Sequence, residues 1–144
     1  MVNKKYKIGY TQGTFDMFHI GHLNLLKHAK EYCDILIVGV NSDSLVQEYK
    51  NKIPVIKEEE RAEILQAIRY VDNVVICNTL KKTEMHEWLH FDAIFIGDDW
   101  KGNDRWKKTE ADLRVRGADV VYLSYTKGVS STMLREEVKN KVRE

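Results

Sequence analysis

Polar and apolar positions follow two different periods along the start of the chain. Residues 5–11 alternate between polar and apolar side chains, with Tyr6 and Tyr10 on one side, as a β-strand does. Over residues 20–32 the apolar positions recur about every three residues, the period of a helix with one buried stripe. The continuous apolar run at 35–40 is typical of a strand buried on both faces of a parallel sheet. These segments predict a β-α-β unit.

The same periods continue to the end of the chain and predict alternating helices and strands. The predicted helices are 58–69, 83–89, 104–116 and 133–142, and the predicted strands are 73–77, 93–96 and 120–123. Residues 44–50 form a short polar segment in this interpretation. Strands that alternate with helices indicate an α/β fold, a Rossmann-like doubly wound five-stranded parallel sheet flanked by helices. The segments that follow its strands are then expected to meet at one edge, where such sheets bind ligands.

Length and charge restrict the classes of protein to consider. The 144 residues fit a single domain over 1–144. Lys and Arg number 23 against 22 Asp and Glu, so neither nucleic acid nor an anionic membrane is expected as the main partner. We find no signal peptide and no apolar run long enough to span a membrane, which favours a soluble cytoplasmic protein. Cys33 and Cys77 form no C-x-x-C motif and are expected to be reduced packing residues.

Two histidines lie three positions apart where the first strand turns into the first helix. His19 and His22 fall in the first helical turn and share a face, and Gly21 between them leaves room for a ligand. The first helical turn after Asp16 contains no acidic residue, so the positive end of the helix dipole stays open to an anion. Two histidines alone are too few for a zinc site, and ordinary surface or core histidines would not explain the glycine between them. The pattern favours phosphate binding.

Other polar segments that follow strands have roles that the residues alone leave open. The hydroxyl-rich run at 126–132 fits either a helix cap or a second anion seat. Residues 98–100, Asp-Asp-Trp, fit a plain turn, a metal site, or recognition of an amide with stacking on the indole. Lys50 and Lys52 fit solvated loop charges or phosphate ligands, and Arg69 fits a solvated helix end.

One motif points to a different chemistry. His86, Glu87 and His90 spell H-E-x-x-H, the zinc-binding motif of metalloproteases. The helix predicted there has only about two turns and is followed by no third ligand. It also leads into the amino end of a strand, the sheet edge opposite to the other motifs. We therefore expect both histidines to be solvated and Trp88 to pack against the fold.

Residues 13–16, Gly-Thr-Phe-Asp, together with His-Ile-Gly-His at 19–22, resemble the H-x-G-H signature of the nucleotidyltransferase superfamily, in particular its cytidylyltransferase branch. Three further segments are similar to elements of glycerol-3-phosphate cytidylyltransferases. They are R-Y-V-D at 69–72, G-D-D-W at 97–100, and Gly-Val-Ser-Ser-Thr at 128–132 where the family has G-I-S-T. The resemblance extends over essentially the whole chain, with the motifs in family order.

This resemblance implies transfer of CMP from CTP to glycerol 3-phosphate, which gives CDP-glycerol and pyrophosphate. The family uses Mg²⁺, which enters with CTP, so no metal ligand is predicted in the chain, and it usually forms homodimers. His19 and His22 are then expected to donate hydrogen bonds to the α-phosphate, while Lys50 and Lys52 close over the transferring groups. The resemblance also implies nucleotide contacts from Gly13, Thr14, Phe15, Asp16, Gly21, Arg69, Asp98, Asp99, Trp100, Thr126, Gly128, Ser130, Ser131 and Thr132.

The chain departs from the family at one position. The arginine of the family's R-T-E-G-I-S-T is Tyr125 here, and a lysine appears two positions later. Residues two apart on an extended segment point the same way, so Lys127 is expected to bind the acceptor beside Tyr125 in place of that arginine. Phosphoethanolamine, phosphocholine and sugar-alcohol phosphates therefore stay open as acceptors. An adenylyltransferase and a nucleotide-sensing domain without activity are further alternatives.

Overall fold

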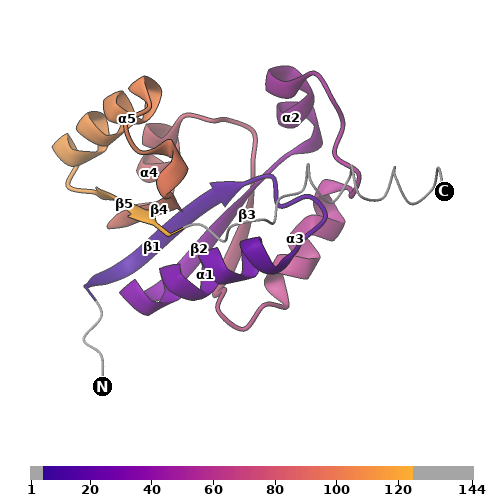
Figure 1. Ribbon diagram of the computed structural model, residues 1–144, viewed down its shortest axis with the longest axis horizontal. Helices are drawn as coiled ribbons and strands as arrows, with labels where there is room; N and C mark the ends of the chain where they lie inside the picture. The colour runs from indigo at the N-terminus through magenta and orange to yellow at the C-terminus, as the bar shows by residue number, and fades with distance from the viewer. Residues whose placement is uncertain (1–4, 125–144) are drawn as a thin grey trace.

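In the computed structural model, which describes residues 5–124, five parallel strands form one sheet with helices on both faces (Figure 1). The strands are β1 (Tyr6–Gly13), β2 (Cys33–Asn41), β3 (Asn73–Cys77), β4 (Ala93–Gly97) and β5 (Asp119–Leu123). The helices are α1 (Ile20–Tyr32), α2 (Asp43–Lys50), α3 (Glu58–Gln66), α4 (Lys82–Leu89), the 3₁₀ turn η1 (Asp98–Trp100) and α5 (Asp104–Val115). This architecture confirms the predicted Rossmann-like fold class.

The order of the strands places a gap for ligands beside β1. The sheet runs β3-β2-β1-β4-β5, so the chain first builds outward from β1 and then returns to add β4 on its other side. Gly9 in β1 is paired with Leu36 in β2 and with Ala93 in β4. The crossovers from β1 and from β4 therefore leave in opposite directions, and the crevice between them is where sheets of this class bind ligands.

The helices form two layers, one on each face of the sheet. Helices α1 and α3 cover one face, where Leu26 and Leu65 are fully buried, and α4 and α5 cover the other, where Met85 and Leu113 are buried (Figure 1). Both cysteines are buried, free and packed in these two layers, as predicted. None of the helices in the described part of the chain is long and apolar enough to cross a membrane.

Three local predictions were wrong. Residues 44–50 belong to helix α2, because the Ser42 hydroxyl accepts a hydrogen bond from the Leu45 amide and two apolar residues of this polar stretch are buried. The helix predicted over 58–69 ends at Gln66 and continues as a turn. Trp88 is 59% exposed and does not pack into the core. The helix predicted over 133–142 lies outside the described residues.

Candidate active site

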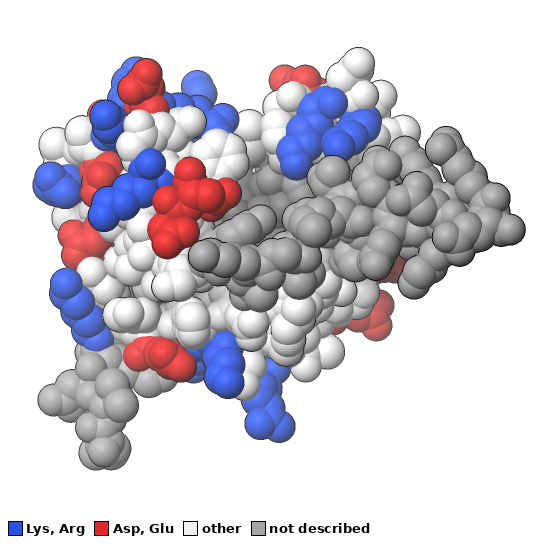
Figure 2. Space-filling view, in the orientation of Figure 1, with Lys and Arg blue, Asp and Glu red and all other residues white. Residues whose placement is uncertain are grey.

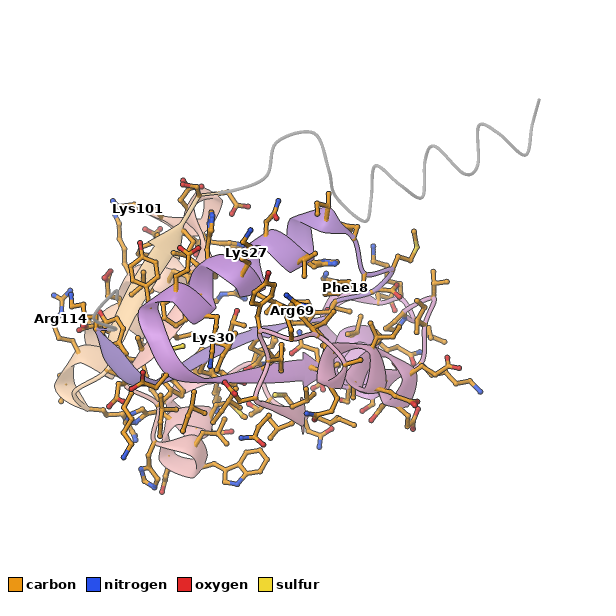
Figure 3. All side chains as sticks on the ribbon, turned by 90° about the horizontal axis from the view of Figure 1, so that it is seen from below. Phe18, Lys27, Lys30, Arg69, Lys101 and Arg114 are labelled. Atoms are coloured by element: carbon orange, nitrogen blue, oxygen red, sulfur yellow. The ribbon has the colours of Figure 1, made fainter. Side chains whose placement is uncertain are left out.

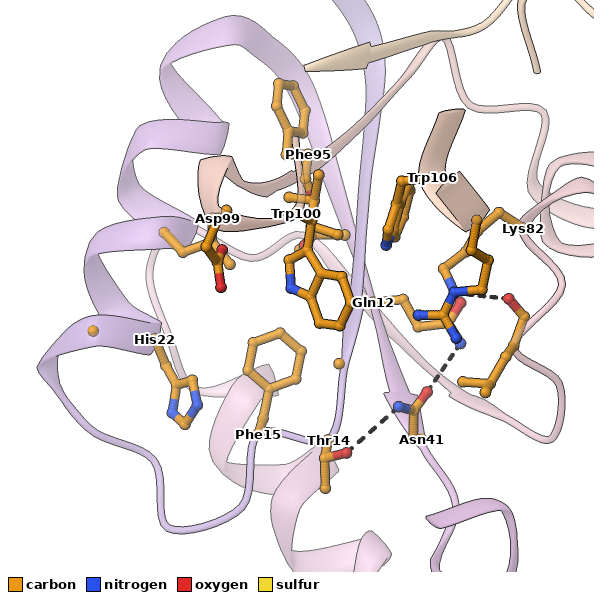
Figure 4. A pocket seen from close by; sticks show the side chains of 18 of the residues that line it. Gln12, Thr14, Phe15, His22, Asn41, Lys82, Phe95, Asp99, Trp100 and Trp106 are labelled. Atoms are coloured by element: carbon orange, nitrogen blue, oxygen red, sulfur yellow. Dashed lines mark hydrogen bonds between the residues drawn. The ribbon is translucent and has the colours of Figure 1, made fainter. Parts of the chain in front are cut away.

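A cavity of about 380 Å³ opens at the carboxyl edge of the sheet. It lies over the ends of β1 and β4, between the start of α1 on one side and the starts of α4 and α5 on the other (Figure 4). His22 and Lys82 lie at opposite sides of this cavity in Figure 4, with the rings of Phe15 and Trp100 between them. The cavity thus lies where the strand order predicts a crevice, and imidazole, ammonium and aromatic side chains line it.

The turn from β1 into α1, which carries Phe15 at the cavity wall, has an unusual backbone. Phe15 and Met17 both adopt left-handed conformations, with φ of 54° and 52°. Non-glycine residues rarely take these values, and such strain is concentrated at functional sites. The turn directs the buried Phe15 ring edge-on against His22, with the ring centroids 5.4 Å apart.

The two histidines cap helix α1 with one ring nitrogen each. His19 is the N-cap residue, and its Nδ1 accepts a hydrogen bond of 3.0 Å from the Gly21 amide. His22 Nδ1 in turn accepts from the His19 amide at 3.2 Å, which completes a reciprocal capping box. An Nδ1 that accepts a hydrogen bond carries no proton, so the proton of each neutral ring lies on Nε2. Each of the two rings can therefore donate one hydrogen bond, from Nε2–H, to a ligand in the cavity.

The surroundings keep both imidazoles neutral. Burial lowers the pKa of His19. Burial and the neighbouring His19 ring lower the pKa of His22 to about 4, although the Asp16 carboxylate acts in the opposite direction. The two rings stack with centroids 3.9 Å apart, a geometry that disfavours charge on either of them. The pair is suited to donating hydrogen bonds to an anion without itself becoming cationic.

A polar network forms the floor of the cavity below this pair. Gln12 Nε2 donates to Asn41 Oδ1 at 2.9 Å (Figure 4), and Asn41 Nδ2 donates to the Tyr49 hydroxyl at 3.2 Å. The Thr14 hydroxyl lies 3.2 Å from the same Tyr49 oxygen. Lys50 also lines the cavity, with its ammonium 5.5 Å from the centre of the Tyr49 ring. This side of the cavity offers hydroxyl, amide and ammonium groups to a ligand.

The segments that carry this floor are joined by Arg61, which is only 1% exposed. Its guanidinium donates to the carbonyl oxygens of Thr14 at 2.7 Å and Asn41 at 2.8 Å, and its Nη2 forms an ion pair of 2.5 Å with Asp43. Nε donates to the Ile56 carbonyl oxygen at 2.8 Å. Arg61 thus fixes the β1 turn, the end of β2, the start of α2 and the segment before α3 relative to one another.

The opposite end of the cavity contains tryptophans and cations. The Asn103 side chain caps α5 by accepting from the amides of Arg105 and Trp106, and this places both side chains at the cavity. Lys82, the first residue of α4, lies with its ammonium 5.6 Å from the centre of the Trp106 ring. Arg105 covers the Trp100 ring at the same distance.

Most of the predicted site residues outside the last segment line this cavity, although they come from four separate stretches of sequence. Those that line it are Gly13, Thr14, Phe15, His19, Gly21, His22, Lys50, Asp99 and Trp100. The predicted residues Tyr125, Thr126, Lys127, Gly128, Ser130, Ser131 and Thr132 lie outside the described residues. Ser124, which precedes them, lines the cavity.

Four predicted site residues are not part of the cavity wall. Asp16 is buried and its carboxylate accepts hydrogen bonds from the amides of Val55 and Ile56, so it holds a neighbouring segment instead. Asp98 is exposed on the outer side of η1. Lys52 follows α2, in a region where Figure 2 shows Lys and Arg side chains together on the surface.

Arg69 is the fourth of these residues. It is exposed and lies on the side of the sheet that α1 covers, as do Lys27 and Lys30 (Figure 3). It is not among the residues that line the cavity. The nucleotide contact from Arg69 stays a prediction.

The sequence interpretation missed five residues that build the site: Gln12, Asn41, Tyr49, Lys82 and Trp106. Four of them lie at the carboxyl end of a strand or at the start of the helix that follows one, and Tyr49 lies in the last turn of α2. Their position relative to the strands was therefore a usable signal, which a search for family motifs passes over.

The H-E-x-x-H segment does not form a metal site in the structure. His86 is half-buried against Phe91, and burial lowers its pKa, while His90 is exposed in a left-handed conformation at the end of α4. The His86 and His90 ring centroids are 6.3 Å apart. Within residues 5–124, no group of three or more His, Cys, Asp or Glu side chains is arranged to hold a metal ion.

A family model described as cytidylyltransferase-like matches residues 10–137, which include the capped histidine pair and the whole cavity. The chain belongs to the cytidylyltransferase-like family. Among its relatives, glycerol-3-phosphate cytidylyltransferase from Bacillus subtilis (strain 168) is 36% identical over 129 residues, 89% of this chain and 94% of the relative. The Staphylococcus aureus (strain NCTC 8325 / PS 47) protein of the same name is 35% identical over 132 residues, with 91% and 94% covered.

Other relatives of this cytidylyltransferase-like chain are longer proteins. The bifunctional protein HldE from Hyphomonas neptunium (strain ATCC 15444) is 35% identical over 130 residues, but the chain spans only 26% of its length. A lipopolysaccharide core biosynthesis protein from Thermoplasma volcanium GSS1 has a similar crystal structure, with a TM-score of 0.74 over 85% of this chain and 99% of that one. At 24% sequence identity this likeness shows the fold alone.

Proposed function

We propose that this cytidylyltransferase-like protein transfers CMP from CTP to a phosphorylated small alcohol, with glycerol 3-phosphate as the acceptor. The observation that carries the proposal is the capping box of His19 and His22, which leaves a neutral N–H donor on each ring at the start of a helix whose first turn has no acidic residue. The two relatives that are similar over almost their whole length are named for this acceptor.

The reaction needs little covalent chemistry from the protein. An oxygen of the acceptor phosphate attacks the α-phosphorus of CTP, the bond from that phosphorus to the β-phosphate oxygen breaks, and pyrophosphate leaves. Negative charge accumulates on the α-phosphate as it becomes five-coordinate. Hydrogen bonds from His19 and His22 to its oxygens, together with the positive end of α1, stabilise that charge.

The rest of the cavity supports the substrates in this proposal. Asp99 and Trp100 suit a pyrimidine base, because a carboxylate can accept from an exocyclic amine while an indole stacks on the ring. Lys50 lies near enough to contribute charge to the phosphates. Mg²⁺ on the phosphates of CTP would neutralise part of their charge. We further propose that the protein acts in the cytoplasm as a homodimer.

The deciding experiment is pyrophosphate release measured across a matrix of nucleotides and acceptors. CTP, ATP, GTP and UTP are each combined with glycerol 3-phosphate, phosphoethanolamine, phosphocholine and a sugar-alcohol phosphate. We expect turnover with CTP and glycerol 3-phosphate, and CDP-glycerol as the product by mass spectrometry. Turnover of ATP without turnover of CTP would show that the proposed nucleotide is wrong, and no turnover with any pair would refute a transferase.

A further inference from the structure

Two cations of the cavity have no acidic partner. Lys82 from α4 and Arg105 from α5 both line it, and neither takes part in any of the ion pairs formed among the described residues. The Lys82 ammonium donates one hydrogen bond of 2.8 Å, to the Leu80 carbonyl oxygen. Burial, followed by the charge of Arg105, lowers the pKa of Lys82 to about 8. The protein thus keeps two like charges close together, at a cost that a bound anion would relieve.

The two tryptophan rings at this end of the cavity each have a basic side chain beside them already. A ligand ammonium is normally bound over the face of Trp, Tyr or Phe, or by a carboxylate. The Trp106 ring already has the Lys82 ammonium 5.6 Å from its centre, and the Trp100 ring has Arg105 at 5.6 Å. Asp99 is the one acidic side chain among the described residues of the cavity wall. An ammonium group brought to this end would be repelled by the two cations, Lys82 and Arg105.

The two ends of the cavity also differ in what they offer a phosphate. At the α1 end the donors are the neutral rings of His19 and His22, which suit a phosphate whose charge changes during the reaction. At the α4 and α5 end the donors carry full charge, which suits the dianionic phosphate of an acceptor before it reacts. Lys82 lies across the cavity from His22 (Figure 4). A second anion can therefore bind at the cationic end while the α-phosphate of the nucleotide lies at the histidines.

We propose that Lys82 and Arg105 form the anion-binding subsite for the acceptor, and that they select phospho-alcohols without an ammonium group and reject phosphocholine and phosphoethanolamine. This inference rests on the proposed function, because it assigns the α-phosphate of the nucleotide to the histidine end. It narrows the substrate class to acceptors whose only charge is negative, such as glycerol 3-phosphate.

The test is a calorimetric titration of the full chain in the presence of α,β-methylene-CTP, a nucleotide that cannot release pyrophosphate. Glycerol 3-phosphate and phosphocholine are titrated into the wild type, Lys82→Met and Lys81→Met. The control residue Lys81 is the neighbouring lysine, whose side chain is 76% exposed and faces Glu84. Arg105→Gln, with Lys107→Gln as its control, provides an independent pair, and thermal unfolding confirms that each variant is folded.

We expect the wild type to bind phosphocholine at least about tenfold more weakly than glycerol 3-phosphate. Lys82→Met should weaken the binding of glycerol 3-phosphate by about 10- to 100-fold, the range for losing a hydrogen bond to a charged group. Lys81→Met should match the wild type, and the affinity for the nucleotide analogue should be unchanged in all variants. Arg105→Gln should reproduce the loss and Lys107→Gln should not.

Three results would overturn the inference: an unchanged affinity for glycerol 3-phosphate in Lys82→Met, equal binding of phosphocholine by the wild type, or a loss that falls on the nucleotide analogue. Pyrophosphate release with CTP, measured on the same preparations, reports on the proposed function separately. Acceptor binding that depends on Lys82 without any turnover would refute the transferase and leave the subsite standing.

Discussion

Arg61 and Lys82 are both basic side chains next to the same cavity, and their surroundings differ in nearly every respect. Arg61 is fully buried, donates to three backbone carbonyl oxygens and pairs with Asp43. Lys82 donates to one carbonyl oxygen, has no carboxylate in an ion pair and faces Arg105. A cation whose hydrogen bonds are all made within the protein shapes a site. A cation whose partners are incomplete is available to a ligand, and the fold is less stable for keeping it.

The largest effect predicted from this comparison is on stability. Arg61→Met leaves Asp43 and the carbonyl oxygens of Thr14 and Asn41 without their partner, so the free energy of unfolding should fall by about 3–5 kcal/mol. Lys82→Met removes a charge that is partly desolvated and should leave that free energy unchanged or slightly higher. Urea denaturation followed by circular dichroism measures both variants. Equal losses would mean that the two cations do not differ as described.

The next effect is on turnover and concerns the histidines. His22→Asn keeps an acceptor close to the position of Nδ1 for the capping hydrogen bond but removes the Nε2 donor. We predict a loss of turnover of about 100-fold or more with little change in stability or CTP affinity. His19→Asn should behave similarly. His86→Ala and His90→Ala are the controls, and activity close to wild type is expected for both; stoichiometric zinc that is lost in these two variants would revive the metalloprotease motif.

A smaller effect follows from the protonation of Lys82. The charge of Arg105 in α5 lowers the pKa of Lys82, and Cys77 in β3 raises it. Because the pKa is lowered to about 8, the side chain is charged at pH 7 and mostly neutral at pH 9. The acceptor phosphate is already doubly charged in this range. The affinity for glycerol 3-phosphate should therefore fall by up to about tenfold between pH 7 and pH 9. Lys82→Arg should lose this pH dependence, and an identical profile in that variant would assign the titration to another group.

Local spacing made part of the site predictable. The H-x-G-H residues act through the first turn of a single helix, so the interval between His19 and His22 is enough to place their rings on one face. The strands could be read from their apolar runs because both faces of the sheet are covered. For the same reason the predicted fold class was correct while the segment at 44–50, where few residues are apolar, was misjudged.

Contacts between distant segments made the rest unpredictable. Arg61 follows three glutamates and has the pattern of a solvated helix, yet its partners lie 47 and 20 positions away at the ends of β1 and β2. Asp16 belongs to a family motif, but its carboxylate holds the amides of Val55 and Ile56, which no local pattern indicates. Lys82 and Arg105 meet only because α4 and α5 cover the same face of the sheet.

Steady-state kinetics with CTP saturating and glycerol 3-phosphate varied compares the two ends of the cavity most directly. Pyrophosphate release is followed for the wild type, His22→Asn and Lys82→Met. We predict that His22→Asn lowers kcat by about 100-fold with little change in the KM for glycerol 3-phosphate. Lys82→Met should raise that KM by about tenfold or more and recover most of the wild-type kcat at saturating acceptor. A fall in kcat with unchanged KM in both variants would contradict the assignment of phosphoryl chemistry to one end and acceptor binding to the other.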